Sequence, residues 1–99
     1  MKNMMQMMKQ AQQMKKNMKK MQDELVNIEM EGQAGGGMVT VLMNGKSTVR
    51  RVHINPDVAD DMETLEDLLV AAFNDAHTKV QTYVDGEVNK LTGGMDLGM

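Results

Sequence analysis

"MMQMMKQAQQMKKNMKKMQDELVNI", residues 4–28, has the most regular apolar pattern in the chain. Its apolar side chains recur at alternating spacings of three and four residues: Met4, Met7, Ala11, Met14, Met18, Met21, Leu25 and Ile28. This is the a/d pattern of a heptad repeat, in which the apolar residues form one seam along an α-helix. Gln, Lys and Met favour helices, and neither Pro nor Gly occurs before Gly32. The stretch therefore predicts a long N-terminal helix.

The apolar seam of this helix predicts a partner. A helix of about 25 residues is roughly 37 Å long, which is more than the rest of a 99-residue chain can cover. We expect the seam to pair with a second copy of the chain, through Met7, Ala11, Met14, Met18 and Met21. An alternative is that the pliable methionines form a groove for apolar peptides, which would make the protein an interaction adaptor.

Charge is segregated along the chain. The net charge is -3, yet residues 1–22 hold six lysines and no acid, whereas residues 55–99 hold ten acids and two lysines. This asymmetry favours a polyanionic partner for the first helix, although a solvated basic face would show the same pattern. The lysines that avoid the seam and are expected to meet such a polyanion are Lys9, Lys15, Lys16, Lys19 and Lys20.

The middle of the chain has the alternating period of β-strands. "NIEMEGQ" (27–33) alternates apolar and polar residues, and residues 38–44 follow with Val39, Val41 and Met43 on one face. The three glycines at 35–37 predict the first turn, and Asn44-Gly45 predicts a type I′ hairpin turn. In the returning strand Val52 and Ile54 are expected to point inward, before Pro56 ends it. We predict three antiparallel strands.

A second helix follows the strands. Asp60 with Glu63 three residues later predicts a capping box at its start. An apolar stripe then runs through Met62, Leu65, Leu69, Ala72, Phe73, Ala76, Val80 and Val84, and should cover the sheet. The prediction is one α+β domain, residues 1–99, in the order α-β-β-β-α, with residues 93–99 as a flexible tail.

Several chemistries find no support in the sequence. Cysteine is absent, and the two histidines, His53 and His77, have no neighbouring set of metal ligands. No catalytic or nucleotide-binding motif occurs, and no run of 18 apolar residues could span a membrane. We therefore expect no enzyme activity, catalytic residue, metal, cofactor or small-molecule substrate, and a cytoplasmic location.

Four stretches resemble the YbaB/EbfC family of bacterial nucleoid-associated proteins. They are "MKQAQQMKKNMKKMQDEL" (8–25), "GGGMVTVLMNG" (35–45), "RRVHINPDV" (50–58) and "METLEDLLVAAFNDA" (62–76), in that order along the chain. The resemblance implies an α-β-β-β-α fold, a tweezer-like homodimer, and binding of double-stranded DNA in the nucleoid without catalysis. Relatives often have a proline near the C-terminus, whereas "GGMDLGM" (93–99) has none.

The expected DNA contact is mainly to phosphates, because lysine attracts a polyanion without reading its bases. Arg51 could add a contact from the sheet, whereas Arg50 is more simply explained by pairing with acids of the second helix. RNA binding remains open, because charge alone does not distinguish the two nucleic acids. A weaker alternative is attachment of the basic helix to a membrane surface.

Overall fold

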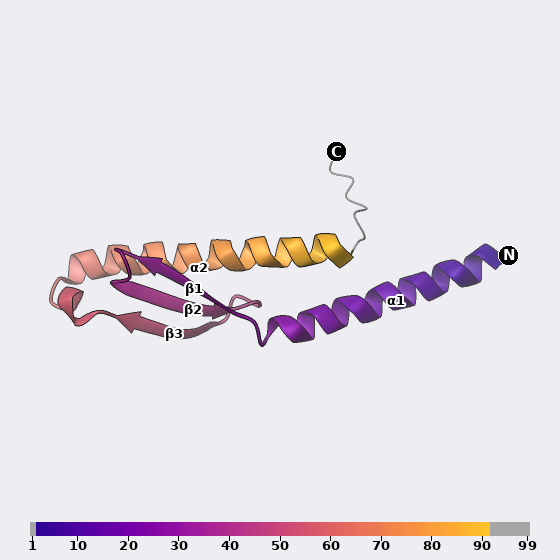
Figure 1. Cartoon of the computed structure of the whole chain (residues 1–99), viewed down its shortest axis with the longest axis horizontal. Helices are drawn as coiled ribbons and strands as arrows, with labels where there is room; N and C mark the ends of the chain where they lie inside the picture. Colours follow the sequence, from indigo (N-terminus) through magenta and orange to yellow (C-terminus); the bar gives the residue numbers. More distant parts are fainter. Residues whose placement is uncertain (1, 92–99) are drawn as a thin grey trace, which may run out of the picture.

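The computed structural model describes residues 2–91, which form two helices and one sheet (Figure 1). The elements are α1 (Lys2–Leu25), β1 (Glu29–Ala34), β2 (Val39–Asn44), β3 (Val49–Ile54), a 3-10 turn at Pro56–Val58, and α2 (Met62–Leu91). The predicted α-β-β-β-α order is thus confirmed. The predicted tail, residues 93–99, lies outside the described residues.

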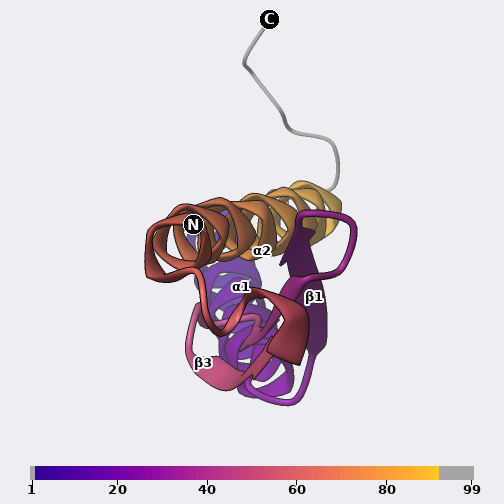
Figure 2. The same cartoon turned by 90° about the vertical axis from the view of Figure 1, so that its left-hand side faces the viewer.

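The core lies between α2 and one face of an antiparallel sheet with strand order β1-β2-β3. Val39 and Val41 of β2 are fully buried against Ala72, Ala76 and Val80 of α2. Figure 2 shows α2 lying over the β1 side of the sheet, and its contacts are mainly to β1 and β2. Of the predicted apolar stripe, Met62 is an exception, because its side chain is exposed.

Gly32 sets the distance between β1 and α2. A Cβ built on Gly32 would lie 2.2 Å from the backbone nitrogen of Ala76 and 2.5 Å from the carbonyl oxygen of Ala72. Only glycine permits this approach of strand to helix. The turn that follows also needs glycine, because Gly35, Gly36 and Gly37 all have positive φ. The predicted turn at these residues is confirmed.

The hairpin between β2 and β3 has a different turn from the predicted type I′. Neither Asn44 nor Gly45 has positive φ; Ser47 takes the left-handed conformation instead, with φ 64. The Asn44 Oδ1 atom accepts the backbone N–H groups of Lys46 and Thr48, both at 2.9 Å. A side-chain acceptor therefore organises a longer loop, which takes the place of the expected two-residue turn.

Strand β3 is less buried than its pattern predicted. It pairs with β2 so that Val52 lies opposite Val41 and Ile54 lies opposite Val39. Val52 and Ile54 therefore lie on the predicted inner face of the sheet. Because α2 packs on the other two strands, Val52 stays 39% exposed. The register shifts between Leu42 and Met43, which leaves Arg50 as the extra residue of a bulge.

The start of α2 lies one residue later than predicted. Asp61, rather than Asp60, caps the helix: its carboxylate accepts the backbone N–H of Thr64 at 3.1 Å and the Thr64 hydroxyl at 2.7 Å. These bonds to the charged form hold the pKa of Asp61 below its usual 3.8. The predicted capping box of Asp60 with Glu63 is therefore replaced by an aspartate N-cap, in which Asp61 accepts from Thr64 at the third helical position.

A second carboxylate ties α2 to the edge of the sheet. Asp75 accepts the backbone N–H of Gln33 at 2.9 Å and forms an ion pair with Lys79 at 3.2 Å. Lys79 in turn donates to the carbonyl oxygen of Glu31 at 3.0 Å. The bond from Gln33, and then Lys79, keeps the pKa of Asp75 below its usual 3.8. Side chains of α2 thus occupy main-chain groups along the outer edge of β1.

These two carboxylates predict a loss of stability in acid. A pKa lowered by folding contributes stability that is fully present above the unfolded value, near 3.8, and is lost as pH falls through the folded value. We expect the melting temperature to fall below about pH 4, and Asp75→Asn to flatten that fall. Circular dichroism melts across this range measure it. The matched control is Glu66→Gln, an exposed acid of the same helix; equal flattening by both variants would contradict the assignment.

Candidate nucleic-acid interface

Most of α1 extends beyond the rest of the structure. Figure 1 shows the N-terminal part of α1 projecting away from the sheet. Every residue from Asn3 to Lys16 is exposed, whereas Met21 and Leu25 near the C-terminal end of the helix are buried. The described chain measures 70 × 28 × 15 Å, and α1 provides much of its length. The exposed part of α1 is 14 residues long. An isolated helix of about 12–15 residues is only marginally stable in water, so a surface that covers this part would also stabilise it.

A network of hydrogen bonds fixes the direction in which α1 leaves the sheet. The Gly45 N–H donates to the carbonyl oxygens of Leu25 and Ile28, at 2.9 and 3.0 Å. The buried Asn44 side chain and Arg50 both donate to the carbonyl oxygen of Val26, at 3.3 and 3.2 Å. A Cβ on Gly45 would lie 2.7 Å from the Leu25 oxygen, so this joint also requires glycine. The sheet therefore holds α1 by its C-terminal end.

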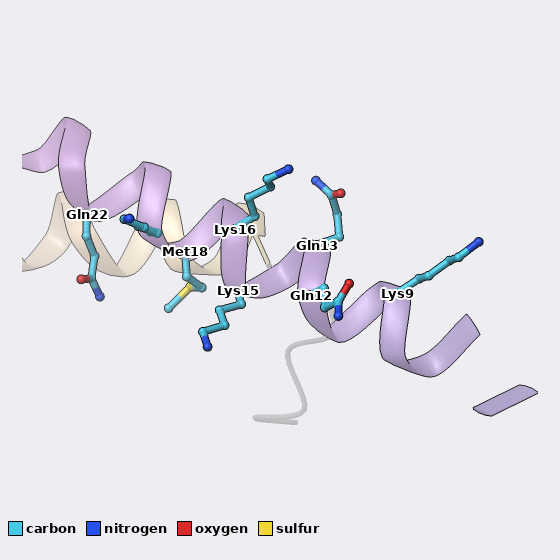
Figure 3. Close-up of a pocket in the computed structure, with 8 residues that line it drawn as sticks. Lys9, Gln12, Gln13, Lys15, Lys16, Met18 and Gln22 are labelled. Atoms are coloured by element: carbon cyan, nitrogen blue, oxygen red, sulfur yellow. The ribbon is translucent and has the colours of Figure 1, made fainter. Parts of the chain in front are cut away.

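Four of the five predicted lysines share one face of α1. Lys9, Lys15, Lys16 and Lys19 line a shallow hollow whose walls all come from this helix, together with Gln12, Gln13, Met18 and Gln22 (Figure 3). In Figure 3, Lys16 and Lys15 extend to opposite sides of this hollow. We call the row Lys9, Gln12, Lys15, Lys16 and Lys19 the lysine face. Because only one helix lines it, it is an open surface suited to a large partner and not an enclosed small-molecule pocket.

The other two predicted cationic residues lie elsewhere. Lys20 lines a separate hollow between α1 and the end of α2, which it shares with Glu24, Glu87 and Lys90. Arg51 lies on the sheet face that α2 leaves open, in a third hollow with Glu31 and with residues of β2 and β3. The structure therefore does not bring Lys20 or Arg51 into the lysine face.

The seam residues differ in how much surface they leave for a partner. Met7 is 66% exposed and Met14 is 38% exposed, Ala11 is also exposed, and Met18 is half-buried. Met21, by contrast, is only 9% exposed because it packs within its own subunit. The open part of the predicted seam therefore runs from Met4 to Met18.

The positions beside the seam carry little charge, a feature not among the expectations from sequence. One flank holds Asn3, Gln10 and Asn17, and the other holds Met8, Lys15 and Gln22. Lys2, Lys9 and Lys16 occupy the heptad position opposite the seam. Two seams could therefore approach with most of the lysines pointing away from the contact. The heptad spacing alone would have revealed this arrangement.

Opposite charges are gathered on the two helices. α1 carries six lysines and two acids, whereas α2 carries six acids and two lysines. Both ion pairs recorded among the described residues lie within α2, at Asp75–Lys79 and Glu87–Lys90. Within those residues, the lysine face is thus an exposed array of cations without carboxylates bound to it.

Within residues 2–91, His, Asp and Glu side chains form no group of three that could hold a metal ion. Neither α1 nor α2 within this range is long and apolar enough to cross a membrane.

Comparison with known proteins points to nucleic acid. The sequence profile of the YbaB/EbfC DNA-binding family matches residues 1–95. A nucleoid-associated protein of Granulibacter bethesdensis is 54% identical over 99 aligned residues, which cover 98% of this chain and 92% of that protein. The crystal structure of an uncharacterized protein from Helicobacter pylori has the same fold, with a TM-score of 0.80 at 22% identity. That match covers 87% of this chain and 92% of the other.

Proposed function

Because the chain belongs to the YbaB/EbfC DNA-binding family, we propose that it is a nucleoid-associated protein that binds duplex DNA through the lysine face of α1. The observation that carries the proposal is the row of four exposed lysines on one side of a projecting helix. Each lysine that meets a phosphate releases condensed counterions, so affinity falls steeply as salt rises. The family is one of DNA-binding proteins and not of enzymes.

The proposal favours phosphates over bases as the main target. Lysine presents a hydrated point charge, which positions a protein on the duplex without specifying sequence. The described part of α1 contains no aromatic side chain, so stacking on single-stranded bases has no platform there. Arg51 remains a proposed second contact from the open face of the sheet.

The experiment that tests the function is a mobility shift with duplex DNA at increasing salt. We expect the logarithm of the association constant to fall linearly with the logarithm of salt concentration, by about 0.9 for each phosphate contact. Competition with single-stranded DNA and RNA separates the nucleic acids. Duplex binding that survives high salt would contradict phosphates as the main target, and preference for RNA would overturn the duplex assignment.

We also propose that the active form is a homodimer joined along the seam from Met4 to Met18. The exposed methionines and the nearly uncharged flanks support this arrangement, because helices pair without bringing like charges together. In such a pair the lysines opposite each seam point outward from both copies. The dimer would therefore carry one outward lysine face on each copy, and DNA that contacts both faces is held more tightly because two weak contacts are linked.

The seam predicts a clear response to charge. Met7 and Met14 are exposed within the subunit, so Met7→Glu with Met14→Glu should leave the fold of one chain intact and disfavour pairing. We expect mass measurement in solution to give a monomer. The matched control is Gln6→Glu with Gln13→Glu, which adds the same charges one residue earlier, off the seam. Retention of dimer mass by the methionine variant would place the contact elsewhere.

A further inference from the structure

Two exposed methionines near the tip of α1 are not explained by the seam. Met5 is 68% exposed and Met8 is 62% exposed. Neither residue occupies an a or d position of the heptad repeat, which Met4, Met7 and Ala11 fill at this end. Met5 lies on the side of the helix away from the seam, and Met8 lies at its margin. Pairing of two seams would therefore leave the Met5 side chain uncovered.

Both methionines continue the lysine face towards the N-terminus. Met5, Lys9, Gln12, Lys16 and Lys19 are separated by four, three, four and three residues, which places them in one row along the helix. Met8, Gln12, Lys15 and Lys19 form a second row by the same spacing. A duplex lying on the lysines would thus meet these two apolar side chains at the free end of α1.

We propose that Met5 and Met8 insert at a base step of the bound duplex and bend it. This inference rests on the proposed function, since it assumes that duplex DNA lies on the lysine face. Apolar side chains, methionine among them, act as wedges that partly unstack base pairs and kink DNA in architectural proteins. The unbranched thioether chain is flexible and contains no charge, so it enters a stack without bringing a hydrated group with it.

The lysines would hold the duplex in place while Met5 and Met8 insert. Phosphate contacts along the same face hold the duplex against the helix, so the energy of unstacking is offset by the contacts that a bent duplex gains. A wedge also explains how a protein that contacts phosphates could acquire a modest sequence preference. Pyrimidine–purine steps such as TA and CA open and kink most easily, whereas A-tracts are stiff. We therefore expect duplexes with a central TA step to be bound more tightly than A-tract duplexes.

The test measures bending and binding separately. A short duplex carries a donor and an acceptor dye at its two ends, and binding is followed by anisotropy while bending is followed by energy transfer. Wild-type protein is expected to raise the transfer efficiency at saturation. Met5→Gln with Met8→Gln removes the apolar groups without changing charge. The salt dependence of duplex binding by this variant should therefore equal that of the wild type. The energy-transfer efficiency should stay at the value of free DNA.

A conservative variant separates a wedge from a loss of helix structure. Met5→Leu with Met8→Leu keeps two apolar side chains of similar size, and is expected to retain both bending and the preference for the TA step. The inference is overturned if wild-type protein binds without a change in transfer, or if the glutamine variant bends DNA as much as the wild type. Absence of duplex binding by wild-type protein in the anisotropy measurement would remove the proposed function, and this inference with it.

Discussion

Replacing Gly32 by alanine is expected to lower the free energy of unfolding by about 3 kcal/mol, because overpacking against backbone atoms cannot be relieved by rotating a side chain. The added Cβ would lie 2.2 Å from the nitrogen of Ala76. To make room, α2 must move away from β1, and that movement loosens the packing of Val41 and Val80 in the core. For a domain of this size the melting temperature should drop by roughly 12–24 °C.

The same substitution at Gly86 is the matched control. Gly86 lies inside α2, and a Cβ built there meets nothing within 4 Å. Alanine favours the helix there, so Gly86→Ala should raise stability by about 0.5–1 kcal/mol. Thermal melts at one protein concentration measure both variants, since an oligomer melts at a temperature that depends on concentration. A Gly32→Ala protein as stable as the wild type would show that the strand and helix are not held this closely.

Gly32 also illustrates how far the sequence could predict the fold. The heptad spacing and the alternating strands fixed the order of the elements, because both patterns are set by local periodicity. A lone glycine inside a strand pattern signals a close backbone approach, so the contact of Gly32 could have been suspected from sequence. Its partner could not, because Ala76 lies 44 residues further along and only the folded chain brings the two together.

The local errors arise where neighbouring residues allow two arrangements. Asp60 and Asp61 are both suitable capping residues, and only the position of Thr64 in the folded helix selects Asp61. The Asn44-Gly45 pair suits a type I′ turn, but Asn44 bonds to Lys46 and Thr48 and gives a longer loop. Gly45 is needed instead for its approach to Leu25, a contact between distant segments.

The candidate interface was predictable in part, because helical spacing is a local property of the sequence. Helical spacing alone puts Lys9, Lys16 and Lys19 along one side of α1, and these three do line the same hollow. What spacing cannot reveal is which side of the helix the remainder of the chain approaches. That arrangement directs Lys20 towards the end of α2 and leaves Arg51 on another element. The exposure of residues 3–16 of α1 likewise depends on the hydrogen bonds to Val26, which join segments that local spacing does not relate.

The second large effect is expected from the lysines. Changing Lys9, Lys15, Lys16, Lys19 and Lys20 to glutamine keeps good helix formers and removes five charges from each chain. If each of the four lysines of the lysine face meets one phosphate in each copy of a dimer, the salt slope falls by roughly 7 and duplex affinity near physiological salt falls at least about a thousandfold. Mobility shifts measure this loss, and circular dichroism and mass should stay as in the wild type. A fall in dimer mass would indicate instead that the lysines pair with the acidic helix of a second copy.

Two neighbouring lysines provide the sharper comparison. Lys19 belongs to the lysine face, whereas Lys20 lies in the hollow beside α2 with Glu24 and Glu87. Lys19→Gln should reduce the salt slope of a dimer by about 2, one unit for each copy, while Lys20→Gln should change it little. Both substitutions alter net charge equally, at adjacent positions of one helix. Equal effects of the two would mean that the overall charge of α1, and not the orientation of its lysines, determines how the protein holds DNA.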